Sequence, residues 1–348
     1  MNKSKVVFVT QPWVNDEATI PAKIWLMNED GTDLKTIYSE IFEYNLGTQF
    51  WRIGWSNKGD MFFVYIPIAK TYTYLIFSRE GNLIKGISES NDPFQNYTQP
   101  SWSPDDKLVY GQRYVGVYEY DIVSDKTLKI LSSSGNVADM SPIISPDGKK
   151  LAILHYEFEH NLFITVFDLT KKGTEPLQGD NRNVGINNSR LLFLTNVSPF
   201  TDADWDIVWT PDSKQLLVYI SNKDNTKEGI YLFDTDGVIE PKQLTKGVLN
   251  IFEQGFRLSP GGVKLVYNPS EDSLSVLDMS DLKVRNYTNN CNLITSISWL
   301  PNSQEVAVAC LHASGITLID VLNDDTTTIP IEVDKGDALL TRVSWSPN

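Results

Sequence analysis

Residues 102–106 read Trp-Ser-Pro-Asp-Asp, and an apolar run from Leu108 to Tyr110 begins two residues later. Proline presets φ at the first corner of a turn, and Asp, Asn and Gly tolerate the tighter or left-handed conformations that follow. The pattern therefore predicts a turn that joins an incoming strand to an outgoing one.

The same pattern recurs along the chain. Each copy has an aromatic or apolar residue, Ser or Thr in most cases, usually Pro, and then a small polar turn. The other copies begin at Trp55, Ile144, Trp209, Leu258, Trp299 and Trp345. A second turn signal, rich in Asp and Gly, follows each copy by about 20 to 25 residues. Each repeat therefore predicts four antiparallel strands, A to D, with the Pro-Asp turn between A and B and the Asp-Gly turn between C and D.

The last copy, Trp345 to Asn348, lacks a strand after its turn, and Lys5 to Val9 supplies an apolar one. Radial repetition closed by pairing the two terminal strands leaves only short, protected sheet edges. We predict an all-β fold, a seven-bladed β-propeller of four-stranded antiparallel blades, closed by pairing the N-terminal strand with the C-terminal repeat. One domain, 1–348, is expected, with a long loop insertion at about 179–206.

The turn and the strand after it resemble the WD40-like (PD40) repeat of TolB-type propellers. The resemblance covers essentially the whole chain and rests on Trp102–Asp106, Ile144–Gly148, Trp209–Ser213 and Trp345–Asn348. It departs from TolB itself, which resembles a six-bladed ring preceded by an α/β domain. The resemblance implies a bacterial repeat protein that is periplasmic or secreted. No signal peptide is expected within this chain, because its first apolar run is too short.

Strand A is predicted to be innermost, with one face buried between blades. The residue two before each motif position is apolar in every repeat, and the motif tryptophans are expected in the blade core. The position three before the motif is never apolar, which predicts a polar channel. Its expected residues are Arg52, Gln99, Asp206, Arg257 and Arg342. Structural pairing of carboxylates with these arginines is favoured over a bound anion, water chain or peptide terminus.

Binding is expected on the face that carries the D-to-A and B-to-C loops, because loops vary while the turns are stereotyped. Aromatic residues beside carboxylates suit sugars, cationic groups and peptides. The predicted binding face contains Trp13, Trp51, Phe94, Tyr97, Phe200, Asp202, Asp204, Trp205 and Phe252. The insertion is placed on the same face, where its apolar centre, Leu191 to Leu194, either packs on the ring or forms an extra strand.

The chain has 44 Asp and Glu against 30 Lys and Arg, a net charge of −14. This acidity argues against nucleic acid, because phosphate binding needs a basic surface. No apolar run reaches the roughly 18 residues of a membrane span, so membrane insertion is not expected. We predict a monomeric, non-catalytic β-propeller scaffold that recognises a protein, peptide or carbohydrate ligand through its loop-rich face.

The alternative function is a polysaccharide-acting, metal-dependent lyase or hydrolase on the same scaffold. Hydrolase, zinc-protease and nucleotide-binding motifs do not occur in the sequence. Its candidate metal ligands are His155, His160 and His312, and solvated histidines are the simpler interpretation. The chain could also be a module of a larger surface protein.

Neither a cofactor nor a disulfide is expected. The Asp-rich turns leave a structural calcium open as an alternative, although they lack the full calcium-loop pattern. The two cysteines, Cys291 and Cys310, are placed several residues out of register in one blade, so we expect free thiols.

Overall fold

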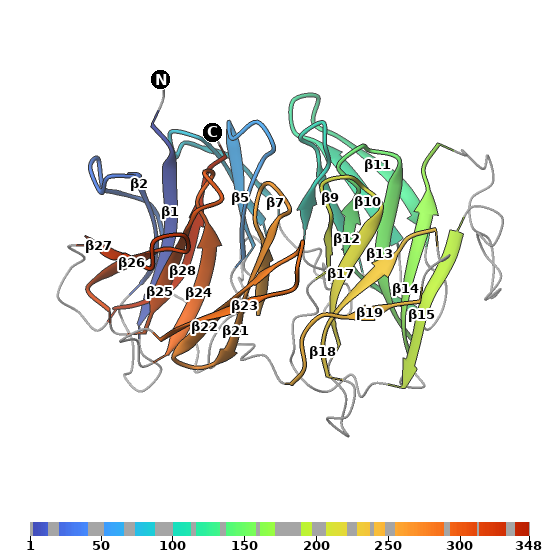
Figure 1. The fold of residues 1–348 in the computed structure, drawn as a ribbon. Helices are drawn as coiled ribbons and strands as arrows, with labels where there is room; N and C mark the ends of the chain where they lie inside the picture. The colour runs from blue at the N-terminus through green and yellow to red at the C-terminus, as the bar shows by residue number, and fades with distance from the viewer. Residues whose placement is uncertain are drawn as a thin grey trace. The chain divides into compact units, whose positions relative to one another are not determined.

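A computed structural model describes most of the chain as β-strands (Figure 1). The described residues are 3–12, 21–40, 52–65, 74–87, 100–112, 116–132, 137–157, 161–170, 189–196, 207–220, 228–236, 240–247, 255–288, 293–311, 313–331 and 338–347. They form 28 strands in seven antiparallel sheets of four strands, and no helix occurs among them. The predicted seven-bladed β-propeller is confirmed.

The chain divides into two compact units, and the prediction of a single domain, 1–348, stays a prediction. The first unit contains Met1–Ile87 and Leu249–Asn348, and the second contains Ser88–Val248. The strands of the first unit are β1 (Lys5–Pro12), β2 (Ala22–Asn28), β3 (Lys35–Glu40), β4 (Arg52–Trp55), β5 (Met61–Tyr65), β6 (Tyr74–Ser78), β7 (Leu83–Ile87), β20 (Phe256–Leu258), β21 (Lys264–Ser270), β22 (Ser273–Asp278), β23 (Val284–Thr288), β24 (Ile294–Trp299), β25 (Glu305–Cys310), β26 (Gly315–Asp320), β27 (Thr326–Pro330) and β28 (Ala338–Trp345). The strands of the second unit are β8 (Ser101–Trp102), β9 (Leu108–Gln112), β10 (Gly116–Asp121), β11 (Lys126–Ser132), β12 (Val137–Ile144), β13 (Lys150–Glu157), β14 (Asn161–Asp168), β15 (Ser189–Asn196), β16 (Ile207–Trp209), β17 (Gln215–Ile220), β18 (Gly229–Asp234) and β19 (Lys242–Gln243).

The repeated motif forms the A–B turn, and its Ser or Thr closes the turn from inside. Ser145 is fully buried, and its Oγ accepts a hydrogen bond from the Lys150 N–H at 2.9 Å while donating to Asp147 Oδ1 at 2.6 Å. Gly148 follows with φ 72°, in the left-handed region. The equivalent residue of every other five-residue A–B turn also has positive φ: Gly59, Asp106, Ser213, Gly262 and Ser303. This backbone requirement explains why small polar residues end the motif.

Blade 7 is built from the two ends of the chain. Strand β28 pairs antiparallel with β1, with Val7 opposite Ser344, and the two lie side by side in Figure 1. The hydrogen bonds of the A–B turn also form there, because Ser346 N–H donates to Lys5 O at 2.8 Å and Lys5 N–H donates to Ser346 Oγ at 2.8 Å. The predicted closing pair is confirmed.

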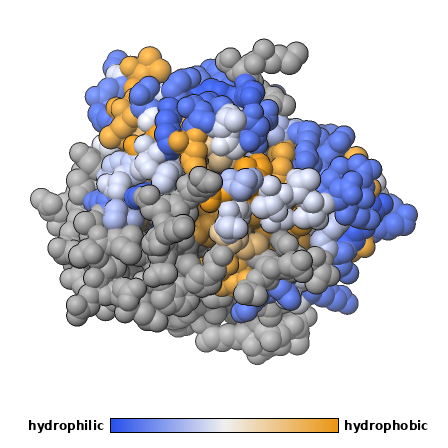
Figure 2. Space-filling model, turned by 90° about the vertical axis from the view of Figure 1, so that its left-hand side faces the viewer, coloured by the Kyte–Doolittle hydropathy of each residue, from blue (hydrophilic) through white to orange (hydrophobic). Residues whose placement is uncertain are grey.

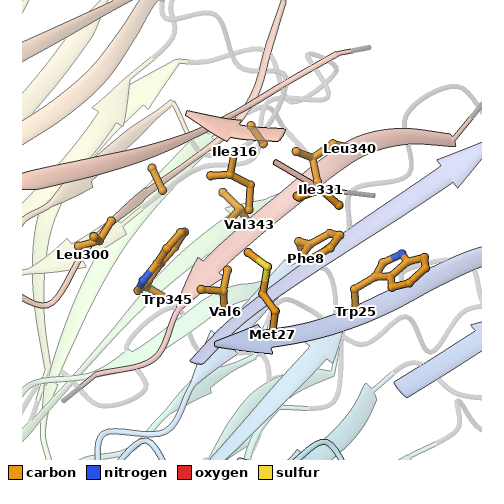
Figure 3. Packing of buried hydrophobic residues seen from close by; sticks show 12 residues of the cluster. Val6, Phe8, Trp25, Met27, Leu300, Ile316, Ile331, Leu340, Val343 and Trp345 are labelled. Carbon is orange, nitrogen blue, oxygen red and sulfur yellow. The ribbon is translucent and has the colours of Figure 1, made fainter. Parts of the chain in front are cut away.

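Apolar side chains fill the space between neighbouring sheets. Figure 3 shows the cluster between blades 6 and 7, where Trp345 and Val343 of β28 lie near Phe8 of β1 and Ile316 of β26. Among the motif tryptophans, Trp209, Trp299 and Trp345 are buried as predicted, while Trp55 and Trp102 are partly buried. The residues two before the motif are buried in six repeats, and the seventh, Ile53, is partly buried.

The predicted loop insertion at about 179–206 needs correction. Its centre lies in β15 (Ser189–Asn196), which pairs with β14 as the regular fourth strand of its sheet. The additional length falls between Asp168 and Ser189, in the C–D connection. It is therefore not placed on the face of the D–A and B–C loops, and the residues on either side of β15 lie outside the described part of the chain.

Candidate functional site: the loop end and the inner strands

Each sheet has two chemically different ends. We call the end with the A–B and C–D connections the turn end, and the end with the B–C and D–A connections the loop end. Backbone hydrogen bonds tie the two turn-end connections together, as between Leu169 N–H and Lys149 O at 2.8 Å and between Val321 N–H and Gln304 O at 2.9 Å. All six A–B connections within the chain have five residues, whereas the loop-end connections range from 2 to 13. Variation in the chain is therefore concentrated at the loop end.

The predicted binding-face residues fall in loop-end connections by their position in the sequence. Trp13 follows β1, Trp51 precedes β4, and Phe252 lies between β19 and β20. The others lie between β7 and β8 or between β15 and β16: Phe94, Tyr97, Phe200, Asp202, Asp204 and Trp205. All nine lie outside the described residues, as do Gln99, Asp206, His160 and His312. His155 belongs to β13, and its backbone pairs with Phe163 of β14.

Three of the predicted channel residues are described, and all three belong to first strands of the first unit. Strands β20, β24, β28 and β4 contact one another in succession, so their residues lie toward a common inner side. Arg342 is 6% exposed, and its Nη1 donates to Thr295 O at 3.3 Å and to Thr341 O. Arg257 Nη1 donates to Phe256 O at 2.7 Å, and Arg52 is partly buried. We call Arg52, Arg257 and Arg342 the inner arginines.

The inner arginines answer part of the question left by the sequence. The structural interpretation expected carboxylates as their partners, and the contacts described for Arg342 and Arg257 go to backbone carbonyls instead. A guanidinium that donates to carbonyl oxygens joins strands without neutralising its charge. These contacts give Arg342 a structural role between β28 and β24, and a ligand role for Arg52 and Arg257 stays a prediction.

Hydroxyl groups of β24 bind the backbone of β28, a feature that the sequence analysis missed. Thr295 Oγ1 donates to Leu340 O at 2.8 Å, and Ser296 Oγ accepts from Val343 N–H at 3.3 Å. Ser298 Oγ accepts from Trp345 N–H at 3.3 Å. Three hydroxyls within Ile294–Trp299 were the available signal. Their partners are more than 40 residues away in the chain, so the signal alone did not identify them.

The motif indoles bind the preceding blade. Their Nε1–H groups donate to a carbonyl one residue before the neighbouring motif position: Trp55 to Ser344 O at 3.3 Å, Trp209 to Ile143 O at 3.2 Å, and Trp299 to Arg257 O at 3.0 Å. Trp345 Nε1 is buried and has no hydrogen-bond partner among the described residues. These contacts give the tryptophans a directional role in addition to burial.

The Asp-rich turns use their carboxylates locally. Asp30 Oδ1 accepts from the Thr32 N–H at 3.1 Å and from Thr32 Oγ1 at 2.6 Å, and Lys3 Nζ donates to the other oxygen. The hydrogen bond from Lys3, followed by those from Thr32, holds the pKa of Asp30 well below its ordinary value. Within the described ranges, no group of three or more His, Cys, Asp or Glu residues is arranged to hold a metal ion. Calcium in a turn stays an untested alternative.

The expectation of free thiols is wrong. Cys310, at the loop end of β25, is disulfide-bonded, and Cys291 is the only other cysteine in the sequence. The estimate of a mismatched register relied on paired strands. Residue 291 precedes β24, where the chain is not constrained by the register that places Ile294 opposite Cys310.

Comparisons with known proteins define the class and no narrower group. No family model and no curated protein matches the chain. Among solved structures, 1260 chains match it in fold. The β-propeller domain of Cps50 (Swd1) from Myceliophteria thermophila has a TM-score of 0.56 and 13% identity, covering 87% of this chain and 97% of its own. TolB from Acinetobacter baumannii has a TM-score of 0.51 and 18% identity, covering 98% and 83%.

An oligogalacturonate lyase in complex with manganese has a TM-score of 0.59 and 12% identity, covering 97% of this chain and 89% of its own. At these identities the three likenesses show the fold alone, and the chain is a β-propeller. One fold therefore serves proteins of quite different kinds. In the described part of the chain, no helix has the length and apolar character needed to cross a membrane.

Proposed function

We propose that this β-propeller is a non-catalytic scaffold that binds a protein, peptide or glycan through the loop end of its sheets. The observation that carries the proposal is the contrast in connection length. Every A–B connection has five residues and uses its polar groups in its own turn, whereas loop-end connections differ up to 13 residues in length. Uniform turns support the sheets, and variable connections provide a surface that can be specific.

The proposal assigns the ligand-contacting surface to aromatic and acidic residues in five loop-end connections. These are Trp13, Trp51, Phe94, Tyr97, Phe200, Asp202, Asp204, Trp205 and Phe252. Flat aromatic groups stack on sugars and cationic groups, and neighbouring carboxylates accept their hydrogen bonds. Arg52 and Arg257, on the inner strands, would add a site for a negatively charged group of the same ligand.

Membership of the PD40 repeat family and an extracytoplasmic location in a bacterium are part of the proposal. The motif resemblance to TolB-type propellers supports both. The disulfide of Cys310 supports the location, because disulfides persist in oxidising compartments such as the periplasm. Purified protein denatured without reductant should show no reactive thiol. Two reactive thiols per chain would contradict this part of the proposal.

The binding proposal is tested by selecting ligands first and locating their contacts second. A displayed random-peptide library and an array of neutral and acidic oligosaccharides supply the candidates. Each selected ligand is then measured against Trp51→Ala and Asp202→Asn, with Val123→Ala as the control, because Val123 is 91% exposed at the turn end. Loss of binding in the two loop-end variants alone is expected. Equal loss in the control, or no selected ligand, would contradict the proposal.

The alternative function is a metal-dependent lyase or hydrolase that acts on an acidic polysaccharide. It is favoured by one observation, the likeness of fold to the manganese-containing oligogalacturonate lyase. Incubating the protein with oligogalacturonate and Mn²⁺ tests it, beside His155→Ala, His160→Ala and His312→Ala. The scaffold proposal expects no cleavage. Metal-dependent cleavage that is lost in the histidine variants would replace it.

A further inference from the structure

The outer strands of the propeller share a feature beyond the sequence motifs. In five sheets a basic residue lies opposite the C-strand residue two positions before the C–D turn residue. The five are Lys35, Lys85, Arg190, Lys242 and Arg285. Strand β11 has an apolar residue, Leu128, at this register position and carries Lys126 and Lys129 beside it. Lysine and arginine on an edge strand oppose pairing with another strand.

Strand β27 is the exception among the seven described outer strands, since it contains no charged residue. Its sequence is Thr-Thr-Thr-Ile-Pro, and Thr327 occupies the position that is basic in five other sheets. Thr326, Thr327 and Thr328 are exposed. Threonine favours extended structure. The edge of β27 therefore lacks the protection that the other outer strands carry.

The hydrogen-bond alternation identifies which backbone groups of β27 point outward. Asp320 N–H donates to Asp325 O at 2.8 Å, and Ile331 N–H donates to Ser314 O at 2.9 Å. In an antiparallel pair, every second residue bonds to its partner strand. Residues 325, 327, 329 and 331 therefore face β26. The N–H and C=O groups of Thr326 and Thr328 face away from the sheet, and Pro330 offers only a carbonyl.

The strand is held firmly from its inner side. Ile331 is buried in the cluster of Figure 3, and Ile329 packs against that cluster while Thr328 stays exposed. Figure 2 looks onto the left-hand side of Figure 1, where β27 is labelled, and shows residues of intermediate hydropathy bordered by hydrophilic ones. An extended segment would meet an edge that is already ordered, which lowers the entropy cost of pairing.

We infer that the edge of β27 is a docking site for an extended segment of another polypeptide with Lys or Arg at its ends. Charge selects this partner, because exposed Asp324 and Asp325 come directly before β27 and no cation lies within it. A second copy of this chain would bring the same acidic residues. Addition of a strand to an open sheet edge uses backbone hydrogen bonds for affinity and flanking side chains for selection. This site is independent of the loop-end proposal.

The test uses labelled peptides with a Val-Thr-Val-Thr-Val centre and either two lysines or two glutamates at each end. Fluorescence anisotropy with the full chain should show the lysine peptide binding about tenfold more tightly than the glutamate peptide. Thr328→Pro removes one outward N–H and should weaken binding about fivefold. Thr328→Val keeps that N–H and should leave binding unchanged. Thr327→Lys supplies the missing cation and should weaken binding of the lysine peptide.

Amide exchange in the unmodified protein provides a second measurement that does not depend on the variants folding. Addition of the lysine peptide should slow exchange of the Thr326 and Thr328 amides and leave that of Thr327, which faces β26, unchanged. Absence of peptide binding, equal binding of both peptides, or unchanged Thr326 and Thr328 exchange would overturn the inference. Gel filtration showing a dimer that is lost in Thr327→Lys would assign the edge to a second copy instead.

Discussion

The indole of the motif tryptophan joins neighbouring blades by one hydrogen bond in addition to its buried area. Trp55, Trp209 and Trp299 each donate to the preceding A strand, and Trp345 does not. In the 6–7 pair, hydroxyls of β24 bind the backbone of β28 instead. The same residue type therefore has different energetic roles in different blades. Burial periodicity predicted these tryptophans in the core, but the direction of each N–H depends on the neighbouring sheet.

Replacing Trp299 and Trp345 by Phe separates the two roles. Both substitutions remove similar apolar area, but only Trp299→Phe loses an interblade hydrogen bond, while Trp345→Phe removes a buried donor with no described partner. Trp299→Phe should therefore lower the free energy of unfolding by about 1 kcal/mol more than Trp345→Phe. Urea denaturation of both variants checks the difference. Equal losses would show that the indole N–H contributes nothing at either position.

The A–B turn carboxylates make stability depend on pH. The hydroxyl of Ser145, followed by the Lys149 backbone N–H, holds the pKa of Asp147 below its ordinary value. A carboxyl with a lowered folded-state pKa contributes stability above its unfolded pKa, about 3.9, and loses it as pH falls through the folded value. The difference in unfolding free energy between the unmodified protein and Asp147→Asn should therefore be larger at about pH 6 than at about pH 3. A difference independent of pH would contradict this.

The five-residue A–B turn is the element that repeats most faithfully. Its Ser or Thr was recognisable in the sequence as a turn former, and the structure adds that the side chain is buried and accepts the amide that begins strand B. Blade 6 has Leu300 at this position, and Asn302 Oδ1 accepts the amides of Gln304 and Glu305 at 2.9 and 3.1 Å. The chain thus satisfies the same backbone groups in two ways.

Ser145→Ala should destabilise the protein by about 1 to 3 kcal/mol, because the buried Lys150 amide loses its hydroxyl acceptor. Ser145→Thr is the matched control, since Thr210 makes the equivalent contact with Gln215 N–H at 3.0 Å in blade 4. Thermal unfolding followed by circular dichroism measures both. A stable alanine variant, or a threonine variant as unstable as alanine, would mean that the hydroxyl does not support the turn.

Strand β15 shows where prediction from the motif fails at the scale of elements. The spacing from Ile144 to Trp209 indicated an insertion, but motif spacing cannot tell which of the connections within a repeat is lengthened. Leu191 to Leu194 are apolar enough for a strand, and an extra strand was one alternative. The additional residues between Asp168 and Ser189 lie at the turn end, so assigning every long connection to the loop end was wrong.

For the whole molecule, seven equivalent repeats could be predicted because each has its own turn signal. The closing pair could also be predicted, since β1 begins with the residue that an A–B turn requires. The candidate site was less accessible. Side chains that meet at a loop end or on inner strands come from distant parts of the sequence, and the partners of Arg342, Thr295 and Ser298 follow from packing between sheets. The exposed edge of β27 becomes apparent only by comparing all seven outer strands in register.

The most direct test of the central claim, that blade 7 repeats the others with its A–B turn divided between the chain ends, is a circular permutant. Ser346 and Lys5 are joined through a copy of residues 146–149, Pro-Asp-Gly-Lys, and new termini are opened between Asp147 and Gly148. If the turns are equivalent, the permutant keeps the all-strand circular dichroism spectrum and unfolds within a few degrees of the unmodified protein. A permutant without strand structure, or one whose β1 and β28 amides exchange freely, would contradict the account.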